Sequence, residues 1–217
     1  MDLCKPVDLC SNTGSPTCWR SKTWGIGLDQ SVLRSMVKWP NVPAVFGWLS
    51  LSRRGKWLIK GEPITHPNSI GFINRNYMPD SEGRWYFQNA AQQVFVTLEY
   101  TPWVYIIDSE NNMLTHTGTM VEMFDGAWLD EDGNLLILTE HGLGILDDRD
   151  LGAISNFFTD NDSQSLSDDE LENRMNSLMA GEKVSLHLNW LGISAPVKPI
   201  KKSDVPSCFG YELEPQA

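Results

Sequence analysis

The sequence predicts a β-rich α+β fold, with an antiparallel or mixed sheet core and a few short helices. The stretch from Gly55 to Asp108 holds the densest aromatic and β-branched patterning in the chain, and its apolar residues largely alternate with the period of two that strands show. The predicted strands are partly apolar on both faces. Such strands usually lie inside a sheet that is covered on each side, so we expect a buried central sheet.

Composition divides the 217 residues into three regions. Residues 1–38 are rich in Ser, Thr, Gly and Lys without a clear period, which predicts a disordered or weakly ordered tail with at most a weak helix over residues 28–36. Residues 39–158 are predicted to form a β-rich core domain. Residues 159–217 are predicted to be an acidic linker, an amphipathic helix, a strand and an extended tail that pack on this core. Because the first region lacks apolar periodicity, we expect the chain before Met36 to be dispensable for folding.

The central stretch is predicted to run strand, helix, then three strands. Residues 56–60 form the first strand, which ends before Pro63 because proline has no donor for a continuing ladder. Pro67 suits a first helical turn, and apolar residues at helical spacing predict a helix over Pro67–Tyr77. Tyr100-Thr101-Pro102 is expected to be a tight connection between the last two strands. The three strands are predicted over residues 85–88, 94–100 and 103–107.

Flanking segments are expected to extend this sheet. The proline-punctuated segment before Gly55 should pack Val45, Phe46 and Trp48 onto it. The acidic turns 80–83 and 130–134 each precede a strand, and this similarity suggests a faint two-fold duplication. Further strands are predicted over residues 113–117, 121–129, 135–140 and 142–146.

Two helices and a strand are predicted in the remaining chain. Asp147 or Asp148 can cap the first helix. Ser167–Glu170 is a capping-box sequence, and alternation over Lys183–Trp190 predicts the strand. The proline-spaced residues 196–206 are expected to lie over the surface before Tyr211 anchors the end. One face of the second helix carries Leu171, Met175, Leu178 and Met179.

The formal net charge of −11 argues against a nucleic-acid or anionic-membrane partner, because phosphates would be repelled. No apolar run in the sequence approaches the roughly 18 residues of a membrane span, and the first ten residues lack the apolar core of a signal peptide. We therefore expect a soluble, cytoplasmic protein. The cysteines have neither the spacing of zinc pairs nor that of a disulfide framework, so no metal or cofactor is expected: Cys4, Cys10, Cys18 and Cys208.

Common catalytic signatures are absent from the sequence, including GxSxG, GxxxxGK[ST], HExxH and GxGxxG. His116, His141 and Glu140 follow predicted strands and could meet as a metal or acid–base cluster. The interpretation that we favour is that the histidines, which include His66 and His187, cap turns and bond to nearby backbone.

Two acidic segments have similar alternatives. Asp130–Asn134 resembles a calcium loop but lacks the bidentate glutamate at the end of a twelve-residue loop. A hairpin turn explains the same residues. The run Asp160–Glu172 could recruit a basic partner, although a solvated linker followed by a negatively charged helix N-terminus accounts for it.

A ligand or peptide cleft is predicted where polar and aromatic residues gather at the ends of central elements. The planar guanidinium of Arg75 is suited to holding a carboxylate or phosphate at two points. The alternative is that Arg75 pairs with an acidic neighbour such as Glu62 or Glu99 and ties the helix to the sheet. The predicted binding residues are His66, Arg75, Asn76, Asn89, Tyr100 and Trp103.

Four runs carry a family resemblance: KWPNVPAVFGWLSLSRRGKWLIKGEPITHPNSIGFINRNY, GRWYFQNAAQQVFVTLEYTPWVY, LDEDGNLLILTEHG and DVPSCFGYELEP. From about Val37 to the C-terminus, the chain resembles a bacterial family known only as a domain of unknown function. Its G-x-P-I-T pattern followed by W-Y-F-Q is also similar to another uncharacterised bacterial family of β-rich proteins. The resemblance implies a fold and a bacterial cytoplasmic setting, and supplies no catalytic residues.

The sequence therefore favours a non-catalytic protein that binds a protein partner or a small ligand. The alternative is a small hydrolase-type enzyme that uses His66, His116 or His141 with nearby carboxylates at strand ends.

Overall fold

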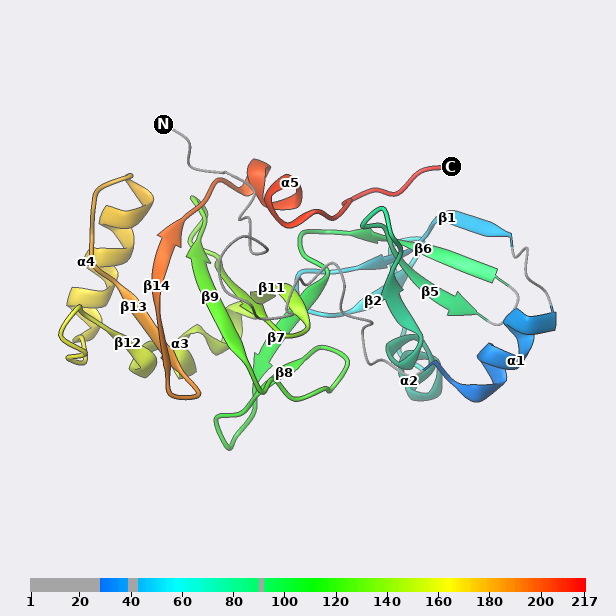
Figure 1. The fold of residues 1–217 in the computed structure, drawn as a ribbon, viewed down its shortest axis with the longest axis horizontal. Coiled ribbons are helices and arrows are strands. Elements are labelled where there is room, and N and C mark those ends of the chain that lie inside the picture. The colour runs from blue at the N-terminus through cyan, green and yellow to red at the C-terminus, as the bar shows by residue number, and fades with distance from the viewer. Residues whose placement is uncertain (1–27, 39–42, 90–91) are drawn as a thin grey trace, which may run out of the picture. The chain divides into compact units, whose positions relative to one another are not determined.

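A computed structural model describes residues 28–38, 43–89 and 92–217 (Figure 1). Two mixed β-sheets with short helices make up these residues, which confirms the predicted β-rich α+β class. The chain divides into two compact units. The first unit contains described residues up to 102 together with 209–217, and the second contains residues 103–208. The division after Pro102 falls inside the span 39–158 that the sequence analysis assigns to one core.

The first unit is built on a six-stranded sheet of order β3-β2-β1-β6-β5-β4. β1 and β6 run parallel, and the other neighbouring pairs run antiparallel. The predicted central helix forms as α2 and begins at the proline after N-cap His66. The elements of this unit are α1 (Gln30–Lys38), β1 (Ala44–Leu51), β2 (Trp57–Ile59), β3 (Glu62–Pro63), α2 (Pro67–Arg75), β4 (Tyr77–Pro79), β5 (Trp85–Asn89) and β6 (Gln92–Leu98).

Aromatic side chains from α2 and the sheet form the core of the first unit. The fully buried Tyr77 ring lies 5.0 Å from Trp57, edge-on, and 4.8 Å from Trp85 between ring centroids. Phe72 of α2 meets Phe87 edge-on at 5.4 Å. Each such ring removes on the order of 200 Å² from water, so the aromatic patterning of the central stretch supplies this core.

The second unit is built on an eight-stranded sheet of order β12-β13-β14-β9-β10-β11-β7-β8. Parallel pairing joins β14 to β9 and β11 to β7. Its strands are β7 (Trp103–Ile107), β8 (Met113–Thr115), β9 (Phe124–Leu129), β10 (Leu135–Thr139), β11 (Gly142–Leu146), β12 (Phe158–Thr159), β13 (His187–Trp190) and β14 (Ile193–Pro199). Its helices are η2 (Asp148–Asp150), α3 (Leu151–Ile154), η3 (Ser155–Phe157), α4 (Asp168–Met179), η4 (Lys202–Asp204) and α5 (Val205–Phe209).

The two sheets repeat one five-stranded topology. In the first unit the hairpin β1–β2 and the meander β4–β5–β6 join through the parallel pair β1 and β6. In the second unit the hairpin β7–β8 and the meander β9–β10–β11 join in the same way, through β7 and β11. This repeat agrees with the two-fold duplication that the acidic turns suggest.

Equivalent hairpins also close with the same turn. Asp80 Oδ1 accepts hydrogen bonds from the backbone N–H groups of Glu82 and Arg84, each at 2.9 Å, and Gly83 has φ +83°. This left-handed conformation strains most side chains but not glycine. The same bonds recur in turns that begin at Asp108, Asp130 and Asp160, with Asn111, Gly133 and Ser163 in the left-handed position. The hairpin-turn interpretation of the calcium-like segment is therefore confirmed.

The expected tight connection at Tyr100-Thr101-Pro102 is wrong, because the strands on either side belong to different sheets. β6 already pairs with β1 on one edge and β5 on the other. β7 pairs with β11 and β8. Apolar alternation identifies a strand, but it does not choose the strand's partners.

Residues 196–206 were expected to lie over the surface, but the first of them belong to a strand inside the second sheet. Pro196 lies within β14, which pairs antiparallel with β13 and parallel with β9. The ladder continues past this proline because Val197 N–H donates to Leu186 O at 2.8 Å. Proline removes one donor only, and here its neighbour supplies the next bond.

Residues 28–38 are part of the first unit, whereas the sequence analysis places them in a tail with at most a weak helix over residues 28–36. They form α1, in which Val32 is 1% exposed. Asp29 N–H also donates to the side chain of Asn76 at 3.0 Å. We therefore no longer expect the whole chain before Met36 to be dispensable; residues 1–27 of the predicted tail lie outside the described residues.

The C-terminal residues return to the first unit and anchor it, as predicted for Tyr211, which is buried. Glu212 N–H donates to Gly83 O, and a Cβ atom at Gly83 would lie 2.2 Å from Gly210 O. Cys208 is disulfide-bonded, which differs from the expectation that the cysteines carry no disulfide framework. No helix among the described residues has the length and apolar character needed to cross a membrane.

Helix α4 forms as its capping box predicts. Ser167 Oγ accepts from Glu170 N–H, and Glu170 Oε2 accepts from Ser167 N–H at 3.0 Å. Leu171 and Leu178 are buried, and the helix contacts β14 and β9. Arg174 Nη1 adds a bond of 2.6 Å to Ser185 O.

Because Leu178 is 3% exposed, we expect Leu178→Ala to lower the free energy of unfolding by roughly 2 kcal/mol or more. Urea denaturation followed by circular dichroism measures this. Asn173→Ala, at an exposed position of the same helix, is the control and should change stability by less than about 0.5 kcal/mol. Equal effects of the two variants would show that α4 is not docked on the sheet.

Candidate binding pocket on helix α4

Two of the predicted binding residues, Arg75 and Asn76, meet at the end of α2, where both hold Asp29. Arg75 Nε and Nη2 bond the two carboxylate oxygens of Asp29 at 3.1 and 3.3 Å. Asn76 is fully buried, and its Nδ2 donates to Phe72 O at 2.9 Å. The bond from Arg75 lowers the pKa of Asp29, which keeps this carboxylate ionised.

Arg75 therefore holds a carboxylate at two points, as its geometry predicts, but the carboxylate belongs to the chain. The partner is neither Glu62 nor Glu99, the two neighbours weighed from the sequence. The ion pair ties the start of α1 to the end of α2, which is a role in the scaffold.

The other four predicted residues lie elsewhere. His66 is exposed at the start of α2, roughly 13 Å along the helix from Arg75. Asn89 is exposed at the end of β5. Tyr100 is 2% exposed in the first unit, and Trp103 is 1% exposed in the second.

The histidines of the alternative enzyme site gather around Trp103. The rings of His116 and His141 lie 5.5 and 6.0 Å from the Trp103 ring. His141 Nε2 is 2.9 Å from Met120 O and 3.4 Å from the carboxylate of Glu140. Among the described residues, no group of three His, Cys, Asp or Glu side chains is placed to hold a metal ion.

These groups bond mainly to backbone. Glu140 accepts from the N–H groups of Glu122 and Met123, at 2.6 and 3.1 Å. His116 Nδ1 accepts from Val104 N–H at 3.3 Å, and burial lowers the pKa of His116 to about 3. A ring that stays neutral and uses one nitrogen to bond the main chain is poorly placed to act as a general base. The geometry thus matches the turn-capping interpretation.

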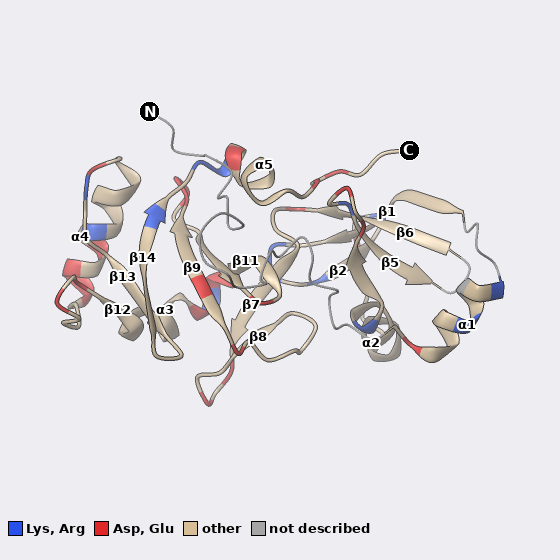
Figure 2. Ribbon diagram, viewed as in Figure 1, with Lys and Arg blue, Asp and Glu red and all other residues tan. Residues whose placement is uncertain are grey.

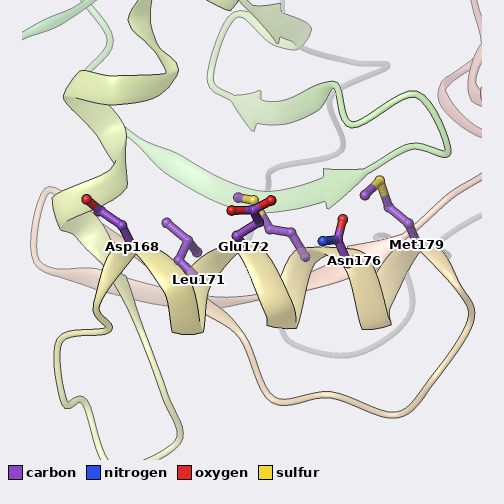
Figure 3. A pocket seen from close by; sticks show the side chains of 6 residues that line it. Asp168, Leu171, Glu172, Asn176 and Met179 are labelled. Atoms are coloured by element: carbon purple, nitrogen blue, oxygen red, sulfur yellow. The ribbon is translucent and has the colours of Figure 1, made fainter.

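A surface pocket of about 280 Å³ lies on one side of α4. Figure 3 shows the labelled side chains rising from the same side of the helix. Met175 and Met179 are half-buried and Leu171 is 7% exposed, so the apolar part is partly covered. Six residues line the pocket: Asp168, Leu171, Glu172, Met175, Asn176 and Met179.

Helical spacing explains this arrangement. Residues four apart lie in one row along a helix, so Leu171, Met175 and Met179 form an apolar row beside the polar row of Asp168, Glu172 and Asn176. The sequence analysis identifies the apolar row but assigns it wholly to docking. In the sequence, the polar row next to the apolar row was the signal that could have indicated that part of the apolar row is not covered by the sheet.

The electrostatic surroundings of the pocket are strongly negative. Seven carboxylate residues and one basic residue, Arg174, lie between Thr159 and Glu182. Figure 2 shows acidic residues at the start of α4 and in the loop before it.

The β9–β10 turn borders the pocket at the C-terminal end of α4. A Cβ atom at Gly133 in this turn would lie 3.8 Å from Met179 Sδ.

The lining residues combine apolar side chains with carboxylates. Flexible methionine side chains adapt to different apolar surfaces and are common at protein-binding sites. The carboxylates of Asp168 and Glu172 can attract cations.

Comparison with known proteins places the chain in a family of unknown function. The model of the DUF2944 family, described as "Protein of unknown function (DUF2946)", matches residues 28–216. The chain therefore belongs to this family, which confirms the resemblance to an uncharacterised domain family. The match begins ahead of the Val37 boundary and includes α1.

A solved structure shares the fold. The crystal structure of a DUF1285 family protein from Silicibacter pomeroyi DSS-3 is similar with a TM-score of 0.50 and 15% identity. The similarity covers 79% of this chain and 88% of that chain, and at this identity it shows the fold alone. No match was found among curated proteins.

We expect Asn76→Ala to lower the free energy of unfolding by about 1–3 kcal/mol, because it leaves two part-buried backbone groups without their bonds to the buried Asn76 side chain. Arg75→Ala should cost at most about 1 kcal/mol, since its ion pair is exposed. Urea denaturation of both variants tests this. A larger loss for Arg75→Ala than for Asn76→Ala would contradict the roles assigned here.

His116 should make stability pH-dependent. Its pKa is about 3 when folded, against an ordinary value of 6.5, so the unfolded chain takes up the proton first. The contribution of neutral His116 to the free energy of unfolding is complete above about pH 6.5. It is lost as the pH falls toward 3, and the free energy of unfolding then decreases by up to about 1.4 kcal/mol per pH unit.

Urea denaturation between pH 7 and 4.5 measures this slope. His116→Asn, which does not titrate there, should flatten it, whereas the control His66→Asn at an exposed site should not. Equal slopes for wild type and His116→Asn would overturn the assignment.

Proposed function

We propose that the protein is a non-catalytic binding protein that holds a protein partner at the α4 pocket. The observation that carries this proposal is the open apolar row of Met175 and Met179 beside an acidic row on the same helix. Binding surfaces combine adaptable apolar contacts with charges that select the partner.

A protein partner fits the pocket better than a small ligand. Sites for drug-sized molecules are mostly enclosed and occupy roughly 300–1,000 Å³. The α4 pocket is smaller, at about 280 Å³, and Asp168, Glu172 and Asn176 on its border are exposed. It can receive a few side chains from a larger molecule.

Two titratable groups of the rival hydrolase hypothesis are engaged in the scaffold. Glu140 and His116 bond to backbone N–H groups. These contacts support binding as the primary role.

A bacterial cytoplasmic location forms part of the proposal, and rests on the resemblance of the four sequence runs to a bacterial family. The disulfide at Cys208 is typical of oxidising compartments and points the other way. Cell fractionation alongside marker enzymes of each compartment tests the location.

The binding proposal predicts that Met175→Ser with Met179→Ser abolishes partner capture. A tagged full-length chain would be expressed in its native cells, and the captured proteins, including untagged copies of this chain, quantified by mass spectrometry. We expect at least a tenfold loss, equivalent to about 1.4 kcal/mol of binding free energy.

The matched control is Asn173→Ser with Ala180→Ser, at exposed positions of α4 and its C-cap outside the pocket lining. It should retain capture, and circular dichroism should show both variants folded. Equal capture by the two double variants would overturn the proposal. So would an ester, phosphoester or glycoside hydrolase activity that a single histidine substitution removes.

A further inference from the structure

Helix α1 carries an exposed apolar row of its own. Leu33 and Val37, four residues apart, are 46% and 86% exposed, while Val32 faces the first unit at 1%. Burying such apolar side chains away from water is favourable. The row therefore has apolar surface to offer a partner.

The neighbouring row of α1 is basic. Arg34 and Lys38 are also four residues apart and exposed, next to Leu33 and Val37. Arg34 makes a long contact of 3.5 Å with Gln30 of the same helix. Helix α1 thus pairs an apolar row with a positive row.

The α4 pocket has the complementary pattern. Its apolar row lies beside Asp168 and Glu172, which are exposed. In the sequence of this helix and just beyond its end, the basic residues are Arg174, which bonds to Ser185 O, and Lys183. Carboxylates outnumber them along the helix, so a basic apolar helix matches both the shape and the charge of the pocket.

We infer that the α4 pocket of one copy receives helix α1 of a second copy. This rests on the proposed function and names the partner. Leu33 and Val37 would fill the methionine row, and Arg34 and Lys38 would face Asp168 and Glu172. This is the helix-in-groove mode, in which one helix offers apolar anchors four residues apart.

The association is expected to be weak. Helix α1 spans about 13 Å, so one contact buries less than the roughly 1,200 Å² of a stable interface. The net charge of −11 also opposes self-association. Each copy has one α1 and one α4, so the contact either closes into a dimer or continues head to tail.

Sedimentation velocity of the purified full chain tests this, from about 5 to 500 μM. We expect the average mass to rise with concentration at low salt and the association to weaken about tenfold or more near 0.5 M salt, where surface charges are screened. A chain that stays monomeric throughout at low salt would overturn the inference.

Variants locate the contact. Val37→Glu and Glu172→Arg each change an exposed side chain and should weaken association at least tenfold. Arg34→Glu should do the same, and Arg34→Glu with Glu172→Arg should restore association. The control Glu214→Arg has the same charge change as Glu172→Arg, at an exposed residue of the C-terminal segment, and should not weaken it.

If Glu214→Arg weakens association as much as Glu172→Arg, or the paired swap gives no recovery, the α1–α4 contact is wrong. A monomeric chain whose methionine variant still loses a captured protein would refute this inference and leave the proposed function standing. A basic helix of another protein would then be the occupant.

Discussion

Each unit depends on one parallel pairing, which joins the first strand of a hairpin to the last strand of a meander. β1 pairs with β6 in this way, and β7 with β11. Parallel neighbours need a crossover connection, so the chain between them must leave the sheet and return from the far side. This constraint places β4 and β9 at the outer edges of the two five-stranded repeats.

The α4 pocket arises because the two outer edges end differently. β4 is the edge of its sheet, whereas β9 is extended by β14, β13 and β12. Helix α4 contacts this extension and buries Leu171 and Leu178. A helix has 3.6 residues per turn, so the row containing Met175 and Met179 is rotated partly out of the contact and borders the acidic row.

Most polar groups that look functional in the sequence serve the scaffold. The carboxylate of Asp108 accepts bonds from its own turn, which lowers its pKa. The buried Asp130 also accepts bonds from its own turn, Glu140 accepts from the backbone of Glu122, and Asp29 is held by Arg75. An ionised carboxylate is stabilised by backbone donors, so an acidic chain can place many such groups at turns. The residues left at the surface pocket are thioethers and solvated acids, which suit recognition.

The sequence by itself determined the features set by residues within about four positions of one another. These include the capping box at Ser167, the proline start of α2 and the acidic turns at Asp80 and Asp130, because their bonds close within a single turn of chain. The strand patterning also gave the β-rich class. Among the predicted site residues, the neighbours Arg75 and Asn76 come together on Asp29.

Tertiary structure decided everything that depends on which segments meet. Three contacts illustrate this: the place of β7 in a second sheet, the strand at Pro196, and the pairing of Arg75 with Asp29. Each involves either a partner far along the chain or a sheet edge that several strands could occupy. Local pattern does not rank such partners, because loop-closure entropy depends only weakly on length and leaves the choice to packing. The same holds for exposure: α1 and α4 have regular apolar rows, and only the packed units decide that Val37 is exposed and Met175 half-buried while Val32 and Leu178 are buried.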